Sequence, residues 1–366
     1  MIKVLVVDDS PTARELLCHL LGTDPEVRVV GAAKDGHEAI QYLRLQRPDV
    51  ITMDIHMPGM NGLEATRTIM ETQPVPIVIV SGNWEPGEVE TTFHAMESGA
   101  LAIVQRPKGI GHPDHSRTTK ELIQTVKLMS EIKVVRRRVR ERQAAERWTA
   151  PGAASYIAPA DVTAVAIGAS TGGPLVIQSI LKGLPRDFPA SIFVVQHVAE
   201  GFLKGMVDWL SETSAVPLVI AGNGEPIAPG RAYFAPDGHN MGLGADCRIR
   251  LVRQPARDAP GASVGYLFRS VAEALGPKAV GILLTGMGRD GAEELRLMRE
   301  RGALTIAQDK ESSVVFGMPA AAIELQAATY VLSPEKILAV LQNMAARMTR
   351  PAITEDAAPS RSPEGR

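Results

Sequence analysis

Residues 2–33 have the sequence IKVLVVDDSPTARELLCHLLGTDPEVRVVGAA, in which a helix-like segment separates two apolar runs rich in valine. The same alternation continues through DVITMD (49–54), PIVIVSG (76–82) and LAIVQRP (101–107). Runs this short and this rich in valine and isoleucine favour strands over helices. Strands that alternate with helices across short loops predict one doubly wound parallel sheet, an α/β domain over residues 1–116.

A second alternation of apolar runs and helix-like segments begins near residue 161. Its runs are VTAVAIGAS (162–170), SIFVVQHV (191–198), PLVIAG (217–222), KAVGILLTGM (278–287) and GALTIAQD (302–309). Between residues 230 and 253, the segments GHN and GADC are typical of turns and predict an antiparallel hairpin insert. The predicted fold class is therefore α/β, with two doubly wound parallel-sheet domains, the second over residues 161–346.

The segment between these domains carries apolar residues every three or four positions from Leu122 to Val139, which predicts one helix over residues 117–148. Its second half is basic but lacks interleaved aromatic residues, so a solvated helix face is favoured over nucleic-acid binding. The following stretch is rich in proline, glycine and alanine, and residues 117–160 are predicted to form a helical and flexible linker. Residues 347–366 have too few apolar side chains to bury and are expected to be disordered.

Composition excludes several classes of protein. The chain has 366 residues, 45% of them hydrophobic, and a formal net charge of -2. This length exceeds one hydrophobic core, and so small a charge provides no basic field for nucleic acid. The apolar stretches are far shorter than a membrane span, and the acidic start does not resemble a signal peptide. We therefore expect a cytoplasmic protein without nucleic-acid partners or membrane insertion.

Three aspartates follow the predicted strands of the first domain. Asp8 and Asp9 come after the first apolar run, and Asp54 ends the third. The carboxyl ends of parallel strands meet in one crevice, where a hard divalent cation relieves the repulsion between carboxylates. Such residues also cap helices, as Asp9 could do before Ser10. Three acids together favour a Mg²⁺ site at Asp8, Asp9 and Asp54, in which one carboxylate attacks a phosphoryl donor.

A serine, a histidine and an aspartate follow apolar runs of the second domain: Ser170, His197 and Asp290. Ser170 has the G-x-S-x-G spacing of a nucleophile elbow, although a glycine-rich turn of this kind can also cradle a phosphate. His197 after the next run suits a general base and favours hydrolysis. The alternative role of Asp290 is to cap the helix that follows it. The chain order differs from that of α/β-hydrolases, so a standard member of that fold is not expected.

Residues 1–116 resemble the receiver domain of two-component response regulators, on Asp8, Asp9, Asp54 and the segment MPGMNG (57–62). The resemblance implies that Asp54 is the phosphoacceptor. It also implies that Asp8 and Asp9 hold Mg²⁺ with help from the backbone carbonyl of His56.

Two further positions in this domain have roles implied by the resemblance, and two depart from the family pattern. Ser81 is the hydroxyl that follows the phosphoryl group. Arg106 stands where the family has lysine, keeps the positive charge and pairs with a phosphoryl oxygen in a different geometry. Lys108, two residues after Arg106, is a second positive charge that could compensate for the missing lysine. Ile103 stands where the family usually has an aromatic residue that rotates inward with phosphorylation.

Residues 162–345 resemble the catalytic domain of chemotaxis protein-glutamate methylesterases of the CheB type, on GASTGGP, VVQH, APDGH, LLTGMGRDGA, TIAQD and VVFGMP. The resemblance implies that Ser170 is the nucleophile, His197 the general base and acid, and Asp290 the residue that orients the imidazole. Backbone N–H groups near Thr171 and Met287 are implied to stabilise the oxyanion.

The implied reaction hydrolyses glutamate γ-methyl esters on the cytoplasmic domains of chemoreceptors and releases methanol, without a cofactor for the esterase. Deamidation of receptor glutamines through the same acyl-enzyme is a second implied activity. A chemotaxis histidine kinase is the implied phosphodonor, and the unphosphorylated receiver is implied to cover the crevice. Two departures from the family, at Gly265 and Ala320, are expected on the substrate face. A receptor-binding module without catalysis and a general small-molecule esterase are the rival hypotheses.

Overall fold

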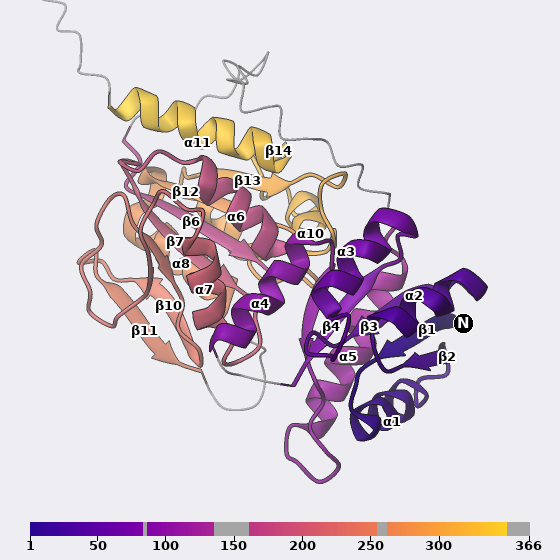
Figure 1. The fold of residues 1–366 in the computed structure, drawn as a ribbon. Coiled ribbons are helices and arrows are strands. Elements are labelled where there is room, and N and C mark those ends of the chain that lie inside the picture. The colour runs from indigo at the N-terminus through magenta and orange to yellow at the C-terminus, as the bar shows by residue number, and fades with distance from the viewer. Residues whose placement is uncertain (83–85, 135–160, 255–261, 350–366) are drawn as a thin grey trace, which may run out of the picture.

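A computed structural model describes residues 1–82, 86–134, 161–254 and 262–349. The first part of the chain forms a five-stranded parallel sheet in the order β2-β1-β3-β4-β5 (Figure 1). Its strands are β1 Ile2–Val7, β2 Val27–Ala33, β3 Val50–Met53, β4 Ile77–Ser81 and β5 Ala102–Gln105. These are the five predicted strands, and the order is that of a doubly wound sheet.

Helices cover both faces of this sheet: α1 Pro11–Leu21, α2 Gly36–Leu45, α3 Gly62–Thr72, α4 Pro86–Glu97 and α5 His115–Ser130. Successive strand residues point to opposite faces. In β1, Leu5 and Val7 therefore join one buried cluster with residues of α2 and α3, while Val4 and Val6 join another with residues of α1 and α5.

Short polar side chains begin several of these helices. The N-cap of α1 is Ser10, whose Oγ accepts from Ala13 N, and the N-cap of α2 is Asp35. Asp9 is therefore not the cap of α1. This leaves the carboxylates of Asp8 and Asp9 available for the crevice at the end of β1.

The helix predicted over residues 117–148 is shorter than expected. α5 ends at Ser130, where Glu131 caps it, and residues 131–134 are not helical. Its buried residues Leu122, Val126 and Met129 pack on the sheet, so the beginning of the predicted linker belongs to the first core. The rest of that linker, residues 135–160, lies outside the described residues. The domain boundaries themselves stay predictions.

The second sheet has seven parallel strands in the order β14-β13-β12-β6-β7-β9-β8. They are β6 Ala164–Ala169, β7 Ser191–Gln196, β8 Leu218–Ile220, β9 Ala232–Phe234, β12 Ala279–Leu283, β13 Leu304–Gln308 and β14 Tyr330–Leu332. The predicted hairpin is present as β10 His239–Leu243 paired antiparallel with β11 Ile249–Arg253.

Three details of the predicted second sheet are corrected. The segment AYF (232–234) was predicted to belong to the antiparallel insert. It is β9 of the parallel sheet, because its backbone pairs with β7 and β8. GADC forms the hairpin turn, whereas His239 and Asn240 of GHN already belong to β10. Strand β14 was not predicted, because its three residues are too few to show a period.

Helices cover both faces of the second sheet as well: α6 Gly173–Gly183, α7 Leu203–Ser211, α8 Val264–Leu275, α9 Ala292–Glu300, α10 Met318–Glu324 and α11 Pro334–Met348. A 3₁₀ turn, η2 Gly276–Lys278, follows α8. Helices α6, α7 and α11 contribute to one buried cluster, and α8, α9 and α10 to the other. Helix α11 reaches Met348, so residues 347 and 348, expected to be disordered, are helical, and residues 350–366 lie outside the described residues.

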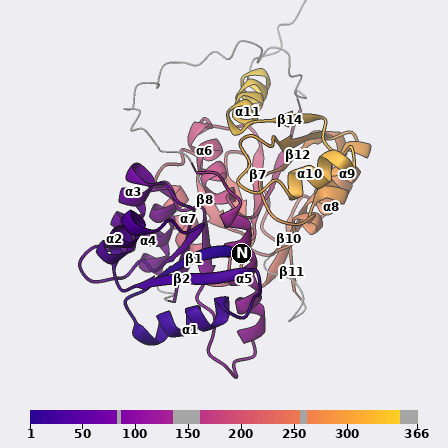
Figure 2. The same cartoon turned by 90° about the vertical axis from the view of Figure 1, so that its right-hand side faces the viewer.

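The two halves of the molecule contact each other along α4 and α7, which lie side by side in Figures 1 and 2. Phe93 of α4 stacks on Trp209 of α7, with ring centroids 5.3 Å apart and planes at 20°. Gln178 of α6 donates from Nε2 to Glu97 Oε1 at 2.7 Å. In the parts of the chain that the structure describes, no helix is long and apolar enough to span a bilayer.

Candidate active site and candidate phosphorylation site

Strands β12, β6 and β7 are neighbours in the second sheet, and the three residues of the predicted triad lie beyond their carboxyl ends. Ser170 follows β6, His197 follows β7, and Asp290 lies in the loop after β12. The backbone ladder continues past the strands, because Ser170 N donates to Thr285 O at 3.0 Å and His197 N donates to Ala169 O at 2.9 Å. The sheet therefore holds Ser170 beside His197.

His197 and Asp290 contact each other directly. His197 Nε2 and Asp290 Oδ2 are 3.0 Å apart, and the two side chains are 18% and 31% exposed. An ionised carboxylate only accepts hydrogen bonds, so Nε2 carries the hydrogen of this contact. In a neutral imidazole with that tautomer, Nδ1 has the lone pair. No hydrogen bond joins Ser170 Oγ to His197 in the described part of the chain. Such contacts are often long in the absence of substrate.

The amino terminus of α8 surrounds the carboxylate of Asp290. Asp290 Oδ1 accepts from Gly265 N at 2.9 Å and Ser263 Oγ at 3.1 Å, and Oδ2 accepts from Val264 N at 2.8 Å. Burial raises the pKa of Asp290, but the hydrogen bond and charge of His197 and the two N–H groups outweigh it and hold the pKa below its ordinary value. The lowered pKa favours the ionised form of Asp290, which accepts the hydrogen bond from His197 Nε2.

Two sequence-based expectations change at this helix terminus. Asp290 does not cap α9, whose N-cap is Gly291 without a side-chain hydrogen bond. Gly265, expected on the substrate face, is buried and donates to Asp290. A Cβ at Gly265 would lie 3.2 Å from Asp290 Oδ1, so this departure from the family pattern lies against the carboxylate of Asp290. Ala320 lies in α10.

Thr285, which the sequence analysis did not single out, holds the loops around Ser170 together. It is fully buried, and its Oγ1 donates to Thr171 O at 2.9 Å and accepts from Val315 N at 2.9 Å. Its own N–H donates to Gln308 Oε1 at 2.8 Å. The sequence feature that could have identified Thr285 is a polar residue at the end of the apolar run AVGILL.

The two residues with predicted oxyanion N–H groups lie on loops that Thr285 connects. Thr171 directly follows Ser170, and Met287 lies between Gly286 and Gly288 with 43% of its surface exposed. A Cβ at Gly286 would lie 2.6 Å from Ser170 Cβ, so the Met287 loop approaches Ser170 closely. The two loops therefore face one another, and the oxyanion role stays a prediction.

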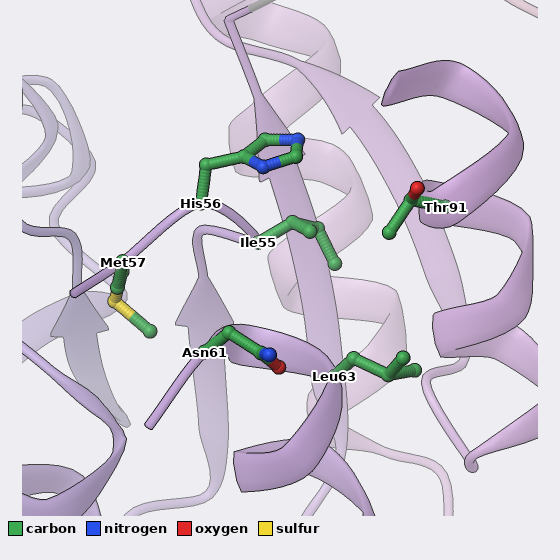
Figure 3. A pocket seen from close by; sticks show the side chains of 6 residues that line it. All are labelled: Ile55, His56, Met57, Asn61, Leu63 and Thr91. Atoms are coloured by element: carbon green, nitrogen blue, oxygen red, sulfur yellow. The ribbon is translucent and has the colours of Figure 1, made fainter. Parts of the chain in front are cut away.

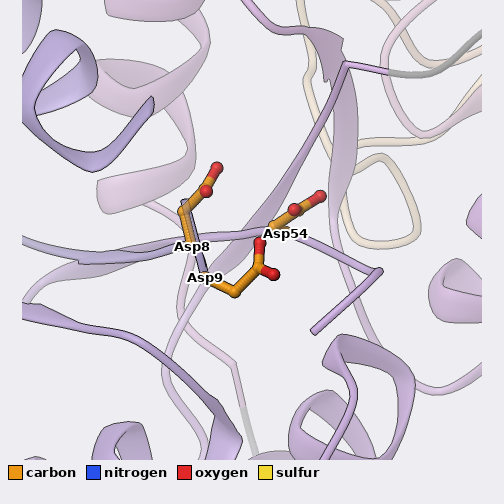
Figure 4. A group of neighbouring side chains, drawn as sticks. All are labelled: Asp8, Asp9 and Asp54. Carbon is orange, nitrogen blue, oxygen red and sulfur yellow. The ribbon is translucent and has the colours of Figure 1, made fainter. Parts of the chain in front are cut away.

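Three carboxylates gather at the ends of β1 and β3, as Figure 4 shows. One oxygen from each of Asp8, Asp9 and Asp54 lies within 4.8 Å of the others. Asp8 and Asp54 are buried, while Asp9 is exposed. Asp8 Oδ1 accepts from Ser10 N at 2.9 Å and Asp54 Oδ1 accepts from Ile55 N at 2.9 Å, which leaves other oxygens to face the crevice.

Arg106, directly after β5, lies between two of these carboxylates. Its Nη2 donates to Asp8 Oδ2 at 2.8 Å and to Asp54 Oδ2 at 3.0 Å. The guanidinium passes over Gly82, where a Cβ would lie 2.9 Å from Nη1 and 3.1 Å from Cζ. Glycine at position 82 thus provides the space that the planar fork of arginine needs.

The electrostatics of this site fit a divalent cation. Burial raises the pKa of Asp8 to about 6, with Asp54 and Asp9 acting in the same direction against Arg106. Burial also raises the pKa of Asp54, although Arg106 opposes it. The single positive charge of Arg106 does not fully offset the negative charges of the three ionised aspartates. A hard cation with oxygen ligands would complete the neutralisation.

The remaining predicted residues of the first domain lie around this crevice. Ser81 is the last residue of β4 and is buried. Ile103 of β5 packs against the first domain's core and against the buried cluster that α4 shares with the second domain. A cavity of about 280 Å³ adjoins the loop after Asp54 and is lined by residues of that loop, α3 and α4 (Figure 3). It therefore opens beside the candidate phosphorylation site.

The comparisons with known proteins concern both halves of the chain. Residues 165–341 match CheB methylesterase, and residues 4–112 match the response regulator receiver domain. The protein-glutamate methylesterase/protein-glutamine glutaminase of Nitrosospira multiformis is 54% identical over 348 residues, which cover 94% of this chain and 98% of that protein. The chain belongs to the CheB methylesterase family.

Other members of the family are also similar over nearly their whole length. Protein-glutamate methylesterase/protein-glutamine glutaminase 4 of Geobacter metallireducens is 52% identical, with coverage of 94% of this chain and 99% of that protein. The crystal structure of the Thermotoga maritima CheB methylesterase catalytic domain is 37% identical, covers 50% of this chain and 98% of that one, and has a TM-score of 0.48. The relatives confirm the predicted family membership, and the strand pairing confirms the two predicted parallel sheets.

Proposed function

We propose that this chain hydrolyses glutamate γ-methyl esters on the cytoplasmic domains of chemoreceptors, and that phosphorylation of Asp54 regulates the reaction. The observation that carries the proposal is the 3.0 Å contact between His197 Nε2 and Asp290 Oδ2. His197 follows the strand that lies next to the strand before Ser170. The relatives named protein-glutamate methylesterase support the substrate class. Because we propose receptor cytoplasmic domains as substrate and a chemotaxis histidine kinase as phosphodonor, we propose that the reaction takes place in the cytoplasm.

In the proposed mechanism, Ser170 Oγ attacks the ester carbonyl and its proton moves to Nδ1 of His197. Asp290, held ionised by its surroundings, stabilises the imidazolium that forms. The imidazolium then gives the proton to the leaving methoxide, and methanol departs. Water hydrolyses the acyl-enzyme by the same route in reverse and leaves a free glutamate and a free serine.

The developing negative charge on the carbonyl oxygen requires hydrogen-bond donors. We assign this role to the backbone N–H groups of Thr171 and Met287, on the loops that Thr285 joins. Loss of one such donor typically lowers the rate by about 10²- to 10³-fold. The same acyl-enzyme also accounts for deamidation of receptor glutamines, with ammonia as the leaving group in place of methanol.

In the receiver domain, Asp8, Asp9 and Asp54 would hold Mg²⁺ together with the carbonyl of His56. When bound, the cation would supply charge neutralisation for the phosphoryl oxygens, and Asp54 would accept the group. Arg106, which contacts Asp54 at 3.0 Å, would pair with a phosphoryl oxygen, and Ser81 would follow the phosphoryl group.

A packed route connects the receiver to the nucleophile turn. Val314 and Val315 join the buried cluster formed by receiver residues such as Val104 and Val126. Val314 also lies against Gly172, two residues after Ser170, and the backbone of Val315 binds Thr285. A change in how the receiver packs would therefore reach both loops beside Ser170.

The test is release of labelled methanol from methylated chemoreceptor membranes by wild type, Ser170→Ala and Asp54→Ala, each with and without Mg²⁺ and acetyl phosphate. The expected result is release that needs Ser170 and rises with acetyl phosphate only when Asp54 is present. Release that ignores acetyl phosphate would refute the regulation and keep the esterase. No release would favour a receptor-binding module, and hydrolysis of p-nitrophenyl esters alone would favour a general esterase.

A further inference from the structure

Gln196, the last residue of β7, bridges the backbones of the two residues proposed as nucleophile and base. Its side-chain amide donates from Nε2 to Ser170 O at 2.9 Å and to His197 O at 2.8 Å. The residue is 8% exposed, and the two acceptors belong to the ends of neighbouring strands. One amide group thus uses both of its hydrogens to join the nucleophile turn to the base.

The orientation of this amide follows from its surroundings. A flipped amide would direct Oε1 at two carbonyl oxygens, which only accept hydrogen bonds. In the observed orientation Oε1 faces Gly173, where any Cβ would collide with it. Pro174, the next residue of α6, has no N–H to offer.

The observed orientation has a cost. Oε1 is one of the buried side-chain oxygens of the described residues that have no hydrogen-bond partner. A buried acceptor without a partner destabilises a fold. Such groups in native structures call for an explanation, and a functional role is one of them. The amide of Gln196 thus leaves Oε1 without a partner while Nε2 holds the two site residues.

We infer that Gln196 is a positioning residue of the hydrolytic site, which fixes the spacing between Ser170 and His197 through their carbonyl groups. The inference rests on the proposed function, because it needs Ser170 and His197 as the reacting pair. Gln196 itself touches no reacting atom. Its loss should therefore lower kcat and leave KM nearly unchanged, since a misplacement of about 1 Å can cost about 10²-fold in rate.

The experiment uses the full chain and compares kcat and KM for p-nitrophenyl acetate in wild type, Gln196→Met, Gln196→Glu and Gln342→Met, with Ser170→Ala as the blank. Methionine keeps the length and apolar bulk of glutamine and removes both donors. Gln342 is the matched control, because its Nε2 also donates to a backbone carbonyl, Gly183 O at 2.7 Å, but on the exposed side of α11. Thermal melts of each variant separate folding from positioning.

We expect Gln196→Met to lower kcat by about 10- to 100-fold with KM within about twofold of wild type, and Gln342→Met to change neither. Gln196→Glu keeps the shape and turns an acceptor toward two carbonyl oxygens, so its kcat should fall further. Its kcat relative to wild type at the same pH should recover as the pH is lowered, because the protonated carboxyl donates one hydrogen bond. A packing role alone would not produce this recovery.

A Gln196→Met variant that folds and keeps more than half of the wild-type kcat would overturn the inference and leave the proposed function intact. If that variant does not fold, the pH series of Gln196→Glu tests the inference instead. A kcat relative to wild type that does not change with pH would then overturn it. If wild type shows no Ser170-dependent hydrolysis of p-nitrophenyl acetate or of methylated receptor, the proposed function fails and the inference falls with it.

Discussion

Phe93 of the receiver half stacks on Trp209 of the catalytic half, with ring centroids 5.3 Å apart. Trp209 is fully buried, and Phe93 and Met96 belong to the same buried cluster as α6 and α7. The cluster therefore runs across both halves, and α4 cannot move without repacking α7. Helix α7 begins six residues after His197. The stacking of Phe93 on Trp209 therefore connects the receiver to the helix that follows His197.

Replacement of Phe93 by alanine should loosen this contact and raise the activity of the unphosphorylated chain several-fold. A buried phenylalanine contributes about 3–5 kcal/mol relative to alanine, so the variant should also melt at a lower temperature. The matched control is Phe188→Ala, in the catalytic core itself, which should lower the melting temperature without raising the activity. Equal basal activity in Phe93→Ala and wild type would contradict the role of the stacking.

Replacement of Asp290 by asparagine should lower kcat by about 10⁴-fold, because the amide no longer holds the imidazole in the tautomer with hydrogen on Nε2. It should leave KM close to wild type, since Asp290 is not proposed to touch the substrate. Steady-state kinetics with methylated receptor measure both. A loss of less than tenfold would mean that another group orients His197.

The stability that Asp290 contributes should depend on pH in a defined direction. Its pKa in the folded chain is below the ordinary value of 3.8, so folding favours the ionised form. The contribution is therefore fully present once the pH is well above the unfolded pKa of 3.8, and it is lost as the pH falls through the folded pKa. Urea unfolding of wild type and Asp290→Asn between pH 3 and pH 6 should show a constant difference above about pH 5 that shrinks at the acid end. A difference that grows on acidification would contradict this sign.

Replacement of Gly286 by alanine should displace the nucleophile turn. The added Cβ would lie 2.6 Å from Ser170 Cβ and 3.1 Å from Ser170 N, and would also collide with Met318. Such a displacement should lower kcat by about 10²-fold. Gly109→Ala is the control, because nothing lies within 4 Å of its Cβ position. A wild-type kcat in Gly286→Ala would show that the loops of Ser170 and Met287 can move apart without loss of activity.

Gly82 and Arg106 should behave as a matched pair in phosphorylation of Asp54. The Cβ of Gly82→Ala would meet three atoms of the guanidinium, so Arg106 should leave Asp54 and the rate of labelling by acetyl phosphate should fall about tenfold. Lysine lacks these atoms, so the double variant Gly82→Ala with Arg106→Lys should regain most of the rate. Phosphate-affinity gels measure the labelling, and a double variant slower than Gly82→Ala would refute the pairing.

Much of the fold was predictable because the strands are buried on both faces. The apolar runs from Ile2 to Val7 and from Ala164 to Ala169 stand out from the helical segments by length and by valine content. Less periodic segments misled the prediction. AYF was taken as part of the hairpin because its three residues carry no signal for parallel pairing, and the apolar spacing beyond Ser130 did not show where α5 ends.

The sequence by itself determined which residues meet at the sheet edges. A parallel strand places the residue after its last apolar position at the carboxyl edge, so Ser170 and His197 were assignable from the runs before them. The same holds for Asp8 and Asp54. This information is local, because each strand's burial pattern already defines its end.

Only the tertiary structure decided which distant groups complete each site. The amino terminus of α8 meets Asp290 and includes Gly265, and Gln196 joins the two strand ends from inside the sheet. Arg106 crosses Gly82 to reach two carboxylates, and Phe93 stacks on Trp209. These contacts depend on how helices pack across the sheets. Residues that meet through packing carry no periodic mark in the chain, so the sequence could not reveal them.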